Sequence, residues 1–287
     1  MNVLINGLSL GSIYALIALG YTMVYGIAKM LNFAHGDIIM VGAYSIYTTM
    51  MLIDQPILGI TVAIVVCTAL GVLTERIAYR PLRGASPLAV LITAIGVSYF
   101  LQSIAQLVYS SKARTFTYVN LGTVEIFGTD MQVTSLLTLG CGVVIMVALT
   151  LFVRKTKIGC AMRAVSEDRG AAQLMGINAN FIIMLTFAIG SALAAAAGAF
   201  YLMRITQVAP TLGSMPGIKA FTAAVIGGIG SLPGAMIGGL FLGLVEQICA
   251  GIPSLAPYTN SIEFGILVLI FLVRPTGLLG KQIREKV

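Results

Sequence analysis

The sequence predicts an all-α protein, a polytopic transmembrane helical bundle of about eight membrane segments that include broken or re-entrant helices. Of its 287 residues, 58% are apolar and only 9% are charged, against roughly 45–50% and 25% in ordinary soluble domains. The 17 basic and 10 acidic residues are too few to cover a soluble surface of this size. The chain is therefore expected to have the lipid bilayer as its main solvent.

The charged residues are also absent from long stretches of the chain. Five runs without a charged residue or histidine cover residues 1–28, 84–111, 131–153, 170–203 and 220–245. Each is long enough to cross a hydrocarbon core of about 30 Å, which takes roughly 20 helical residues. Three further runs are shorter or interrupted, at 38–53, 55–74 and 257–273. Together they predict one transmembrane domain that covers residues 1–287.

The basic residues predict the orientation of the chain. They gather in three clusters: Arg76, Arg80 and Arg83; Arg154, Lys155, Lys157, Arg163 and Arg169; and Arg274, Lys281, Arg284 and Lys286. Cytoplasmic loops of membrane proteins collect Lys and Arg, so these clusters are expected inside, and the polar stretch 111–130 and Arg204 outside. This pattern explains the basic charge without a nucleic-acid partner, and it leaves Lys29 and Lys219 unassigned.

Two segments interrupt the apolar runs. Residues 25–44 carry polar or small residues between two apolar stretches, and residues 226–243 carry Gly, Ser and Pro within an apolar stretch. Such interruptions in two halves of a chain indicate broken helices at a transport pathway, although close packing of helices is an alternative role for the glycines. We predict a place at a helix break or on the translocation route for seven residues: Asn32, His35, Gly36, Asp37, Gly230, Pro233 and Gly234.

The loop at residues 159–178 has the signals of a short cytoplasmic helix. Ser166 is suited to the N-cap, Glu167 and Asp168 to the first turn, and Gly176 to the left-handed position that ends a helix. The pattern predicts a helix of about ten residues with Ala171, Leu174 and Met175 on one side. A helix this short is marginal alone, so its apolar side either packs on the membrane helices or docks on a cytosolic partner.

Four motifs in order support a family resemblance: LNFAHGDIIMVGAY (31–44), AVSEDRGAAQLMGIN (164–178), GGIGSLPGAMIGGL (227–240) and RPTGLLG (274–280). With them, the whole chain resembles permeases of branched-chain amino-acid ABC transporters. The resemblance implies a multi-pass subunit of a bacterial inner (plasma) membrane that translocates leucine, isoleucine and valine. It also implies four partners: a second, related permease subunit in a heterodimer, two cytosolic ATP-binding subunits and an extracytoplasmic substrate-binding protein.

In that family the loop after the fifth segment contains the coupling helix that contacts the ATPase. The resemblance implies this role for Ser166, Glu167, Asp168, Ala171, Ala172 and Gly176. It also favours a structural role for His35, hydrogen-bonded near Asp37 or Asn32, over a proton relay, because the family shares the AHG triplet and is driven by ATP.

Other classes of function are weighed against this interpretation. The chain has no G-x-x-x-x-G-K-[ST] phosphate loop, and no pattern predicts a catalytic residue, a metal site or a cofactor, so an enzyme is not expected. A urea or short-amide ABC permease stays open, as does a channel or proton-driven secondary carrier for small amino acids or amides. Glu246 and Glu263 fall within apolar runs and require a cavity, a partner or a place at the outer interface.

The charge pattern yields a test of orientation. In a background without the four native cysteines, Thr117→Cys should react with an impermeant thiol reagent added to intact cells, whereas Lys157→Cys should react only after the membrane is opened. Labelling of Lys157→Cys but not Thr117→Cys in intact cells would reverse the predicted topology.

Overall fold

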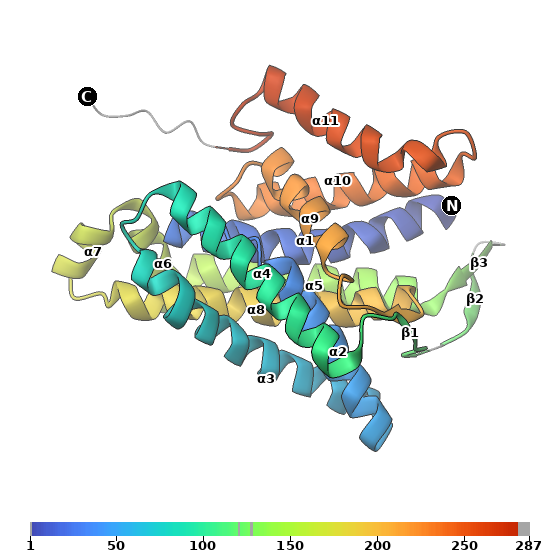
Figure 1. Ribbon diagram of the computed structural model, residues 1–287. Coiled ribbons are helices and arrows are strands. Elements are labelled where there is room, and N and C mark those ends of the chain that lie inside the picture. The colour runs from blue at the N-terminus through green and yellow to red at the C-terminus, as the bar shows by residue number, and fades with distance from the viewer. Residues whose placement is uncertain (1, 120, 127–128, 281–287) are drawn as a thin grey trace.

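The computed structural model describes residues 2–119, 121–126 and 129–280. Eight of its helices are long and apolar enough to cross a membrane, which confirms the predicted polytopic helical bundle. Figure 1 shows the long helices packed side by side, with small β-pairs at one end of the bundle. Lys281, Arg284 and Lys286 of the third basic cluster lie outside the described residues.

The helices in chain order are α1 (Asn2–Ala28), α2 (His35–Ile53), α3 (Pro56–Thr74), α4 (Pro87–Tyr109), α5 (Val133–Lys155), α6 (Lys157–Glu167), α7 (Arg169–Leu174), α8 (Ala179–Arg204), α9 (Ser214–Gly227), α10 (Leu232–Gly251) and α11 (Thr259–Val273). A π-helical turn η1 (Glu75–Tyr79) and a 3-10 turn η2 (Arg80–Leu82) continue α3, and a 3-10 turn η3 (Ala256–Tyr258) precedes α11.

Helix α1 is the centre of the bundle. It is almost continuously buried from Gly7 to Val24, and it packs against α10, α8, α5 and α9. Its contact with α10 is backbone to backbone, because a Cβ atom at Gly243 would overlap the backbone of Gly11 and one at Gly239 would overlap Ala15. Small residues allow such close approach within membranes, so the glycines of α10 set the spacing of the core.

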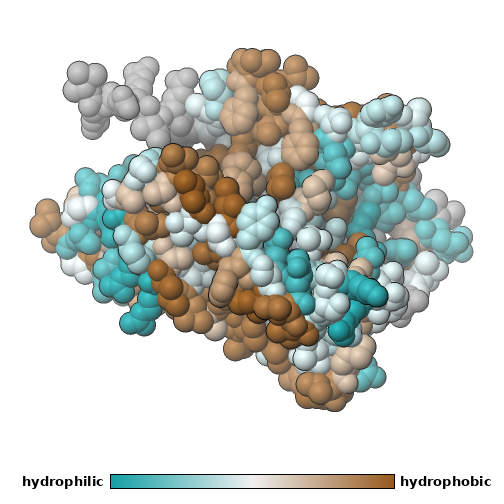
Figure 2. All heavy atoms as spheres, viewed as in Figure 1, coloured by the Kyte–Doolittle hydropathy of each residue, from teal (hydrophilic) through white to brown (hydrophobic). Residues whose placement is uncertain are grey.

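Helices α3, α4 and α11 lie at the periphery and keep large apolar side chains exposed. Examples are Val65 on α3, Leu107 on α4 and Leu272 on α11, which are 63%, 86% and 77% exposed. Figure 2 shows hydrophobic residues along the flank of the molecule and hydrophilic residues gathered toward its two ends. This distribution is that of a bundle whose sides face hydrocarbon.

The two ends of the bundle carry the segments that the charge pattern separates. At one end, β1 (Arg114–Thr115) pairs antiparallel with β4 (Gln207–Val208), and β2 (Thr123–Ile126) forms a hairpin with β3 (Thr129–Gln132). Helices α6 and α7 lie at the other end (Figure 1). The first two basic clusters share that end, because Arg83 and Arg169 both donate to the Asn180 side chain.

Helix α9 does not cross the bundle. Its 14 residues extend about 21 Å, less than the roughly 30 Å of a hydrocarbon core. The charge-free run 220–245 is therefore divided between α9 and α10, and the chain turns at residues 228–231. Helix α9 is thus the helical part of a broken crossing, since it starts beside Gly36 within the bundle and ends at the turn into α10.

The glycine contact between α1 and α10 yields a prediction about assembly. Gly243→Leu should lower the yield of folded protein, because overpacking of a tight core costs about 1–3 kcal/mol. Gly140→Leu on α5 is the matched control, since a Cβ atom there meets no atom within 4 Å. Yield measured by size-exclusion chromatography in detergent should fall for the first variant only; an equal yield for both would contradict the packing.

Candidate functional site

The first chain break brings α2 back into the bundle. Helix α1 ends at Ala28, Lys29 adopts a left-handed backbone conformation with φ 57°, and α2 begins at His35. The His35 ring lies against Gly20 and packs on Tyr21 with ring centroids 4.7 Å apart. Gly20 precedes the end of α1 by eight residues, or about 12 Å of helix. Helix α2 therefore starts well inside the bundle.

The start of α9 meets the start of α2. A Cβ atom at Gly36 would lie 2.7 Å from the Gly213 carbonyl oxygen and 3.3 Å from the Gly217 Cα. Gly213 is the N-cap of α9, so two helix N-termini adjoin within the membrane-embedded part of the protein. Their close contact is possible because none of the three residues has a side chain.

Protein groups satisfy the polar side chains of the first break. Asn32, 2% exposed, accepts a hydrogen bond of 2.7 Å from the Tyr79 hydroxyl. Asp37, equally buried, accepts one of 2.8 Å from the Gln102 side-chain amide, which also lies 3.4 Å from the Ser214 hydroxyl. Gln102 on α4 thereby links the first turns of α2 and α9. Irregular backbone at membrane depth requires such internal partners.

His35 differs from its expected environment. The sequence interpretation pairs its ring with Asp37 or Asn32, and this is wrong, because those two residues bond Gln102 and Tyr79. The imidazole instead faces α1, and its Nε2 has no hydrogen-bond partner among the described residues. Its 1% exposure and its contact with Tyr21 make it a packing group at the start of α2.

The second chain break is a turn between two helices. Helix α9 ends at Gly227, and Gly228 and Gly230 turn the chain with φ values of +104° and +93°. The Ser231 hydroxyl then caps α10 by accepting from the Gly234 N–H at 3.2 Å. Pro233 stands in the first turn of α10, where its missing N–H costs nothing. Gly234 packs directly on the Gly227 carbonyl.

The C-terminal motif RPTGLLG completes this turn. The N–H groups of Leu278 and Leu279 donate to the carbonyls of Ile226 and Gly227 at 2.9 and 3.0 Å. These carbonyls belong to the last turn of α9, where the helix itself supplies no N–H group to donate to them. The segment after α11 therefore satisfies the C-terminal end of α9, a role that the sequence interpretation did not assign.

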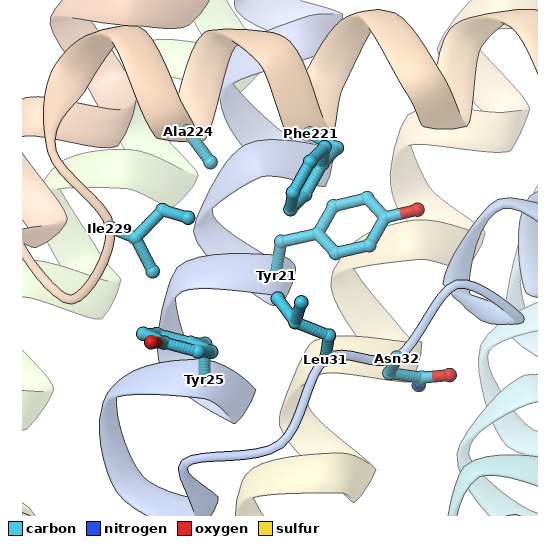
Figure 3. Close-up of a pocket in the computed structure, with 7 residues that line it drawn as sticks. All are labelled: Tyr21, Tyr25, Leu31, Asn32, Phe221, Ala224 and Ile229. Carbon is cyan, nitrogen blue, oxygen red and sulfur yellow. The ribbon is translucent and has the colours of Figure 1, made fainter. Parts of the chain in front are cut away.

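The two breaks meet around a small pocket. A Cβ atom at Gly26 would lie 3.4 Å from the Gly230 Cα. Beside this contact is a narrow pocket with no room for a water molecule, lined by Tyr21, Tyr25, Leu31, Asn32, Phe221, Ala224 and Ile229. Figure 3 shows that these residues come from α1, α9 and both breaks. Apart from Asn32 and the two tyrosine hydroxyls, the lining side chains are apolar.

The loop at residues 159–178 forms parts of two helices, and two expectations for it are wrong. The single helix of about ten residues is replaced by the end of α6 and a six-residue α7, and Ser166 does not start α7. Ser166 is not an N-cap, because it lies inside α6 and its hydroxyl donates to the Arg163 carbonyl at 2.7 Å. Glu167 is the last residue of α6. The N-cap is Asp168, whose carboxylate accepts from the Ala171 N–H at 2.9 Å and starts α7. An aspartate caps a helix as well as a serine does, so the pattern admits either residue.

Helix α7 ends in an exposed apolar tip. Gly176, with φ +82°, ends the helix as predicted, and the Ile177 N–H donates to the Ala172 carbonyl at 3.0 Å. Ala172 is buried, whereas Leu174 and Met175 are 90% and 83% exposed. Figure 2 shows hydrophobic atoms at the left edge of the molecule, where α7 lies. Packing on the membrane helices therefore buries Ala172 but leaves Leu174 and Met175 uncovered, so it does not explain the apolar tip.

Comparison with known proteins finds relatives along almost the whole chain. Residues 3–272 match the family model described as branched-chain amino acid transport system, permease component. The permease protein BraD of the high-affinity branched-chain amino acid transport system of Pseudomonas aeruginosa is 44% identical, over 99% of this chain and 97% of its own length. LivH of Escherichia coli K12 is also 44% identical, over 98% and 96%.

The chain belongs to the branched-chain amino acid transport permease family. A probable LivH from Methanocaldococcus jannaschii is 30% identical over 94% of this chain and 89% of its own length. Among solved structures, PsaBC from Streptococcus pneumoniae has a TM-score of 0.49 and 16% identity over 96% of this chain and 91% of the matched chain. Permease components belong to transport systems, so this multi-pass membrane protein is a transport subunit.

Several residues that build this permease site escape sequence reasoning. Gln102 and Phe221 sit in charge-free runs where nothing distinguishes them from lipid-facing or core residues, and Tyr79 lies within the basic cluster between Arg76 and Arg80. The structure brings them to Asn32, Asp37 and the pocket. Pairings across 47 and 65 positions of the chain leave no local pattern that a single sequence reveals.

The buried Asn32–Tyr79 hydrogen bond in the permease yields a quantitative prediction. Asn32→Leu should lower thermal stability, because a buried hydroxyl left without an acceptor costs about 1–3 kcal/mol. The double variant Asn32→Leu/Tyr79→Phe should recover part of this loss, since it removes the orphaned hydroxyl. Unfolding of the purified protein in detergent provides the measurement. A double variant that is less stable than Asn32→Leu alone would contradict the assigned bond.

Proposed function

We propose that this chain is the membrane-spanning permease subunit of a bacterial ABC importer for leucine, isoleucine and valine, located in the inner (plasma) membrane. The proposal is carried by 44% identity, along nearly the whole chain, to permeases named for high-affinity branched-chain amino acid transport. Its partners would be a second permease subunit in a heterodimer, two cytosolic ATP-binding subunits and an extracytoplasmic substrate-binding protein.

The tip of α7 supports docking to an ATP-binding subunit. Leu174 and Met175 project from the end that carries the basic clusters and have almost no cover within this chain. Burial of one such side chain contributes about 1.5–3 kcal/mol. In this proposal the tip fills a groove on the ATPase, and Asp168 and Gly176 fix the direction in which α7 projects.

A movement of the docked tip would be transmitted to the membrane helices by the helices that pack against it. Helix α6 packs on α5, α8 and the inner part of α1, and α7 packs on α6 and α8. Asn178 caps α8 by accepting from the Phe181 N–H at 3.1 Å, so α7 and α8 are joined by only a short link. A displacement of α7 by the closing ATPase would therefore move α8 and, through it, α1.

The pocket between the breaks supports an apolar substrate. The pocket is closed in this structure, and when it opens Leu31, Phe221 and Ile229 would offer contacts to a branched aliphatic side chain, and Tyr21 and Tyr25 would offer aromatic surface. We propose that the route of the substrate passes this pocket and that Asn32, His35, Gly36, Asp37, Gly230, Pro233 and Gly234 shape it without binding the substrate tightly.

Uptake by the reconstituted transporter tests the substrate. Proteoliposomes with all subunits, the binding protein outside and ATP inside should accumulate labelled leucine, and unlabelled isoleucine and valine should compete. Competition by urea or acetamide alone would assign the chain to the amide permeases, and accumulation driven by a proton gradient without ATP would assign it to the secondary carriers.

The α7 tip yields a prediction about coupling. Leu174→Asp/Met175→Asp should weaken docking by about 3 kcal/mol or more, or roughly 100-fold, and should abolish ATP-driven uptake while membrane insertion stays normal. Leu121→Asp, at an exposed apolar residue toward the other end of the bundle, is the matched control and should transport normally. Co-purification of the ATPase provides the readout; full retention and full uptake by the double variant would refute the assigned role.

A further inference from the structure

Three ionisable side chains meet inside the membrane-embedded part of the protein. Lys219 on α9 places its ammonium nitrogen 2.8 Å from a Glu246 oxygen on α10 and 3.2 Å from a Glu263 oxygen on α11. The side chains of Lys219 and Glu263 are 7% and 1% exposed, and that of Glu246 is 21% exposed. One buried ammonium group therefore serves two carboxyl groups.

The surrounding groups supply no second cation. The Tyr14 hydroxyl on α1 donates to the other Glu246 oxygen at 2.6 Å, and Tyr201 on α8 lies near the same carboxyl group. Arg204, at the end of α8, donates instead to the Gln247 side chain at 2.6 Å and toward the Asn6 carbonyl. Among the described residues, Lys219 is the cation in contact with the two glutamates.

The two carboxyl groups have unequal partners. Both oxygens of Glu246 are engaged, one by Lys219 and one by Tyr14. Neither oxygen of Glu263 has a hydrogen-bond partner among the described residues, and its contact with Lys219 is an ion pair without hydrogen-bond geometry. The two carboxyl groups lie close together, because one oxygen of each is within 3.2 Å of the same Lys219 nitrogen. Glu263 is thus the poorly compensated member of the cluster.

The three side chains have unequal numbers of positive and negative groups, one ammonium and two carboxyls. With all three groups ionised, the cluster carries one net negative charge in a region of low dielectric, where an unbalanced charge is costly. A buried carboxyl group relieves this cost by taking up a proton. A protonated Glu263 would also gain a hydroxyl that can donate to the neighbouring Glu246 carboxylate.

We propose that Lys219, Glu246 and Glu263 form a proton-binding site, in which one proton resides on Glu263 and is shared with Glu246. The proton makes the cluster neutral and holds α9 against α10 and α11. Its release leaves two carboxylates beside one ammonium, and their repulsion loosens α11 from the bundle. This site does not depend on the identity of the transported substrate.

Infrared spectroscopy of the assembled transporter in lipid at neutral pH tests the proton directly. The difference spectrum between wild type and Glu263→Gln should contain the C=O stretching band of a protonated carboxyl group. Glu125→Gln, which removes an exposed acid from β2, is the matched control and should instead show the loss of a carboxylate. A carboxylate band in the Glu263→Gln difference spectrum would overturn the proposal.

The pH dependence of stability provides a second readout that a merely structural role would not give. Raising the pH from about 5 to about 7 should lower the Tm of the wild type more than that of Glu263→Gln, because the unfolded chain has lost the Glu263 proton in this range while the folded protein still holds it, and the amide binds no proton in either state. Parallel curves for the two proteins would contradict the site. A wild-type Tm that rises with Na⁺ at constant ionic strength and pH, and does not in Glu263→Gln, would assign the counter-ion to a metal cation and overturn the proposal.

Discussion

Direct backbone contact between helices is the constraint on which the rest of this structure depends. Helices α1 and α10 meet through Gly11, Gly239 and Gly243, and α9 and α10 meet where Gly238 packs on the Ala223 carbonyl. In hydrocarbon the hydrophobic effect does not drive helices together, so association relies on close packing and on hydrogen bonds. The small residues place α9 near α1 and α10, although α9 is too short to span the membrane.

That packing allows the chain to break twice at membrane depth. Each break leaves backbone and side-chain groups that lipid cannot satisfy, and each finds partners from remote segments. Tyr79 and Gln102 serve Asn32 and Asp37 at the first break, and the backbone of residues 278–279 serves the end of α9. The two irregular segments can then approach each other around one largely apolar pocket, which lies on the route that we propose for the substrate.

The sequence predicts the architecture well because the bilayer imposes it. Charge-free runs must be helical and about 20 residues long, so eight spans follow from composition and spacing. Polar residues such as Asn32 and Asp37 within an apolar stretch identify the first break, the glycines and Pro233 identify the second, and Gly176 identifies the end of α7. Where two residue types satisfy one requirement the prediction fails, as with Ser166 and Asp168 at the N-cap of α7.

The partners of buried polar residues could not be predicted. The contacts of His35 with Gly20 and Tyr21 depend on how far the chain re-enters after α1. The meeting of Lys219 with Glu246 and Glu263 depends on the packing of three helices, and the sequence shows only that an acid in an apolar run needs some partner. Single-sequence patterns are local, whereas these pairings are not.

Cross-linking of the first break to α9 tests the central claim most directly. The rings of Phe33 and Phe221 lie 5.2 Å apart, so Phe33→Cys/Phe221→Cys in a cysteine-free background should be joined by a short bifunctional thiol reagent. Asn6→Cys/Ser135→Cys, at a hydrogen-bonded pair between α1 and α5, is the positive control. Efficient cross-linking of both pairs is the predicted result. Cross-linking of the control alone would show that α9 does not return to the first break.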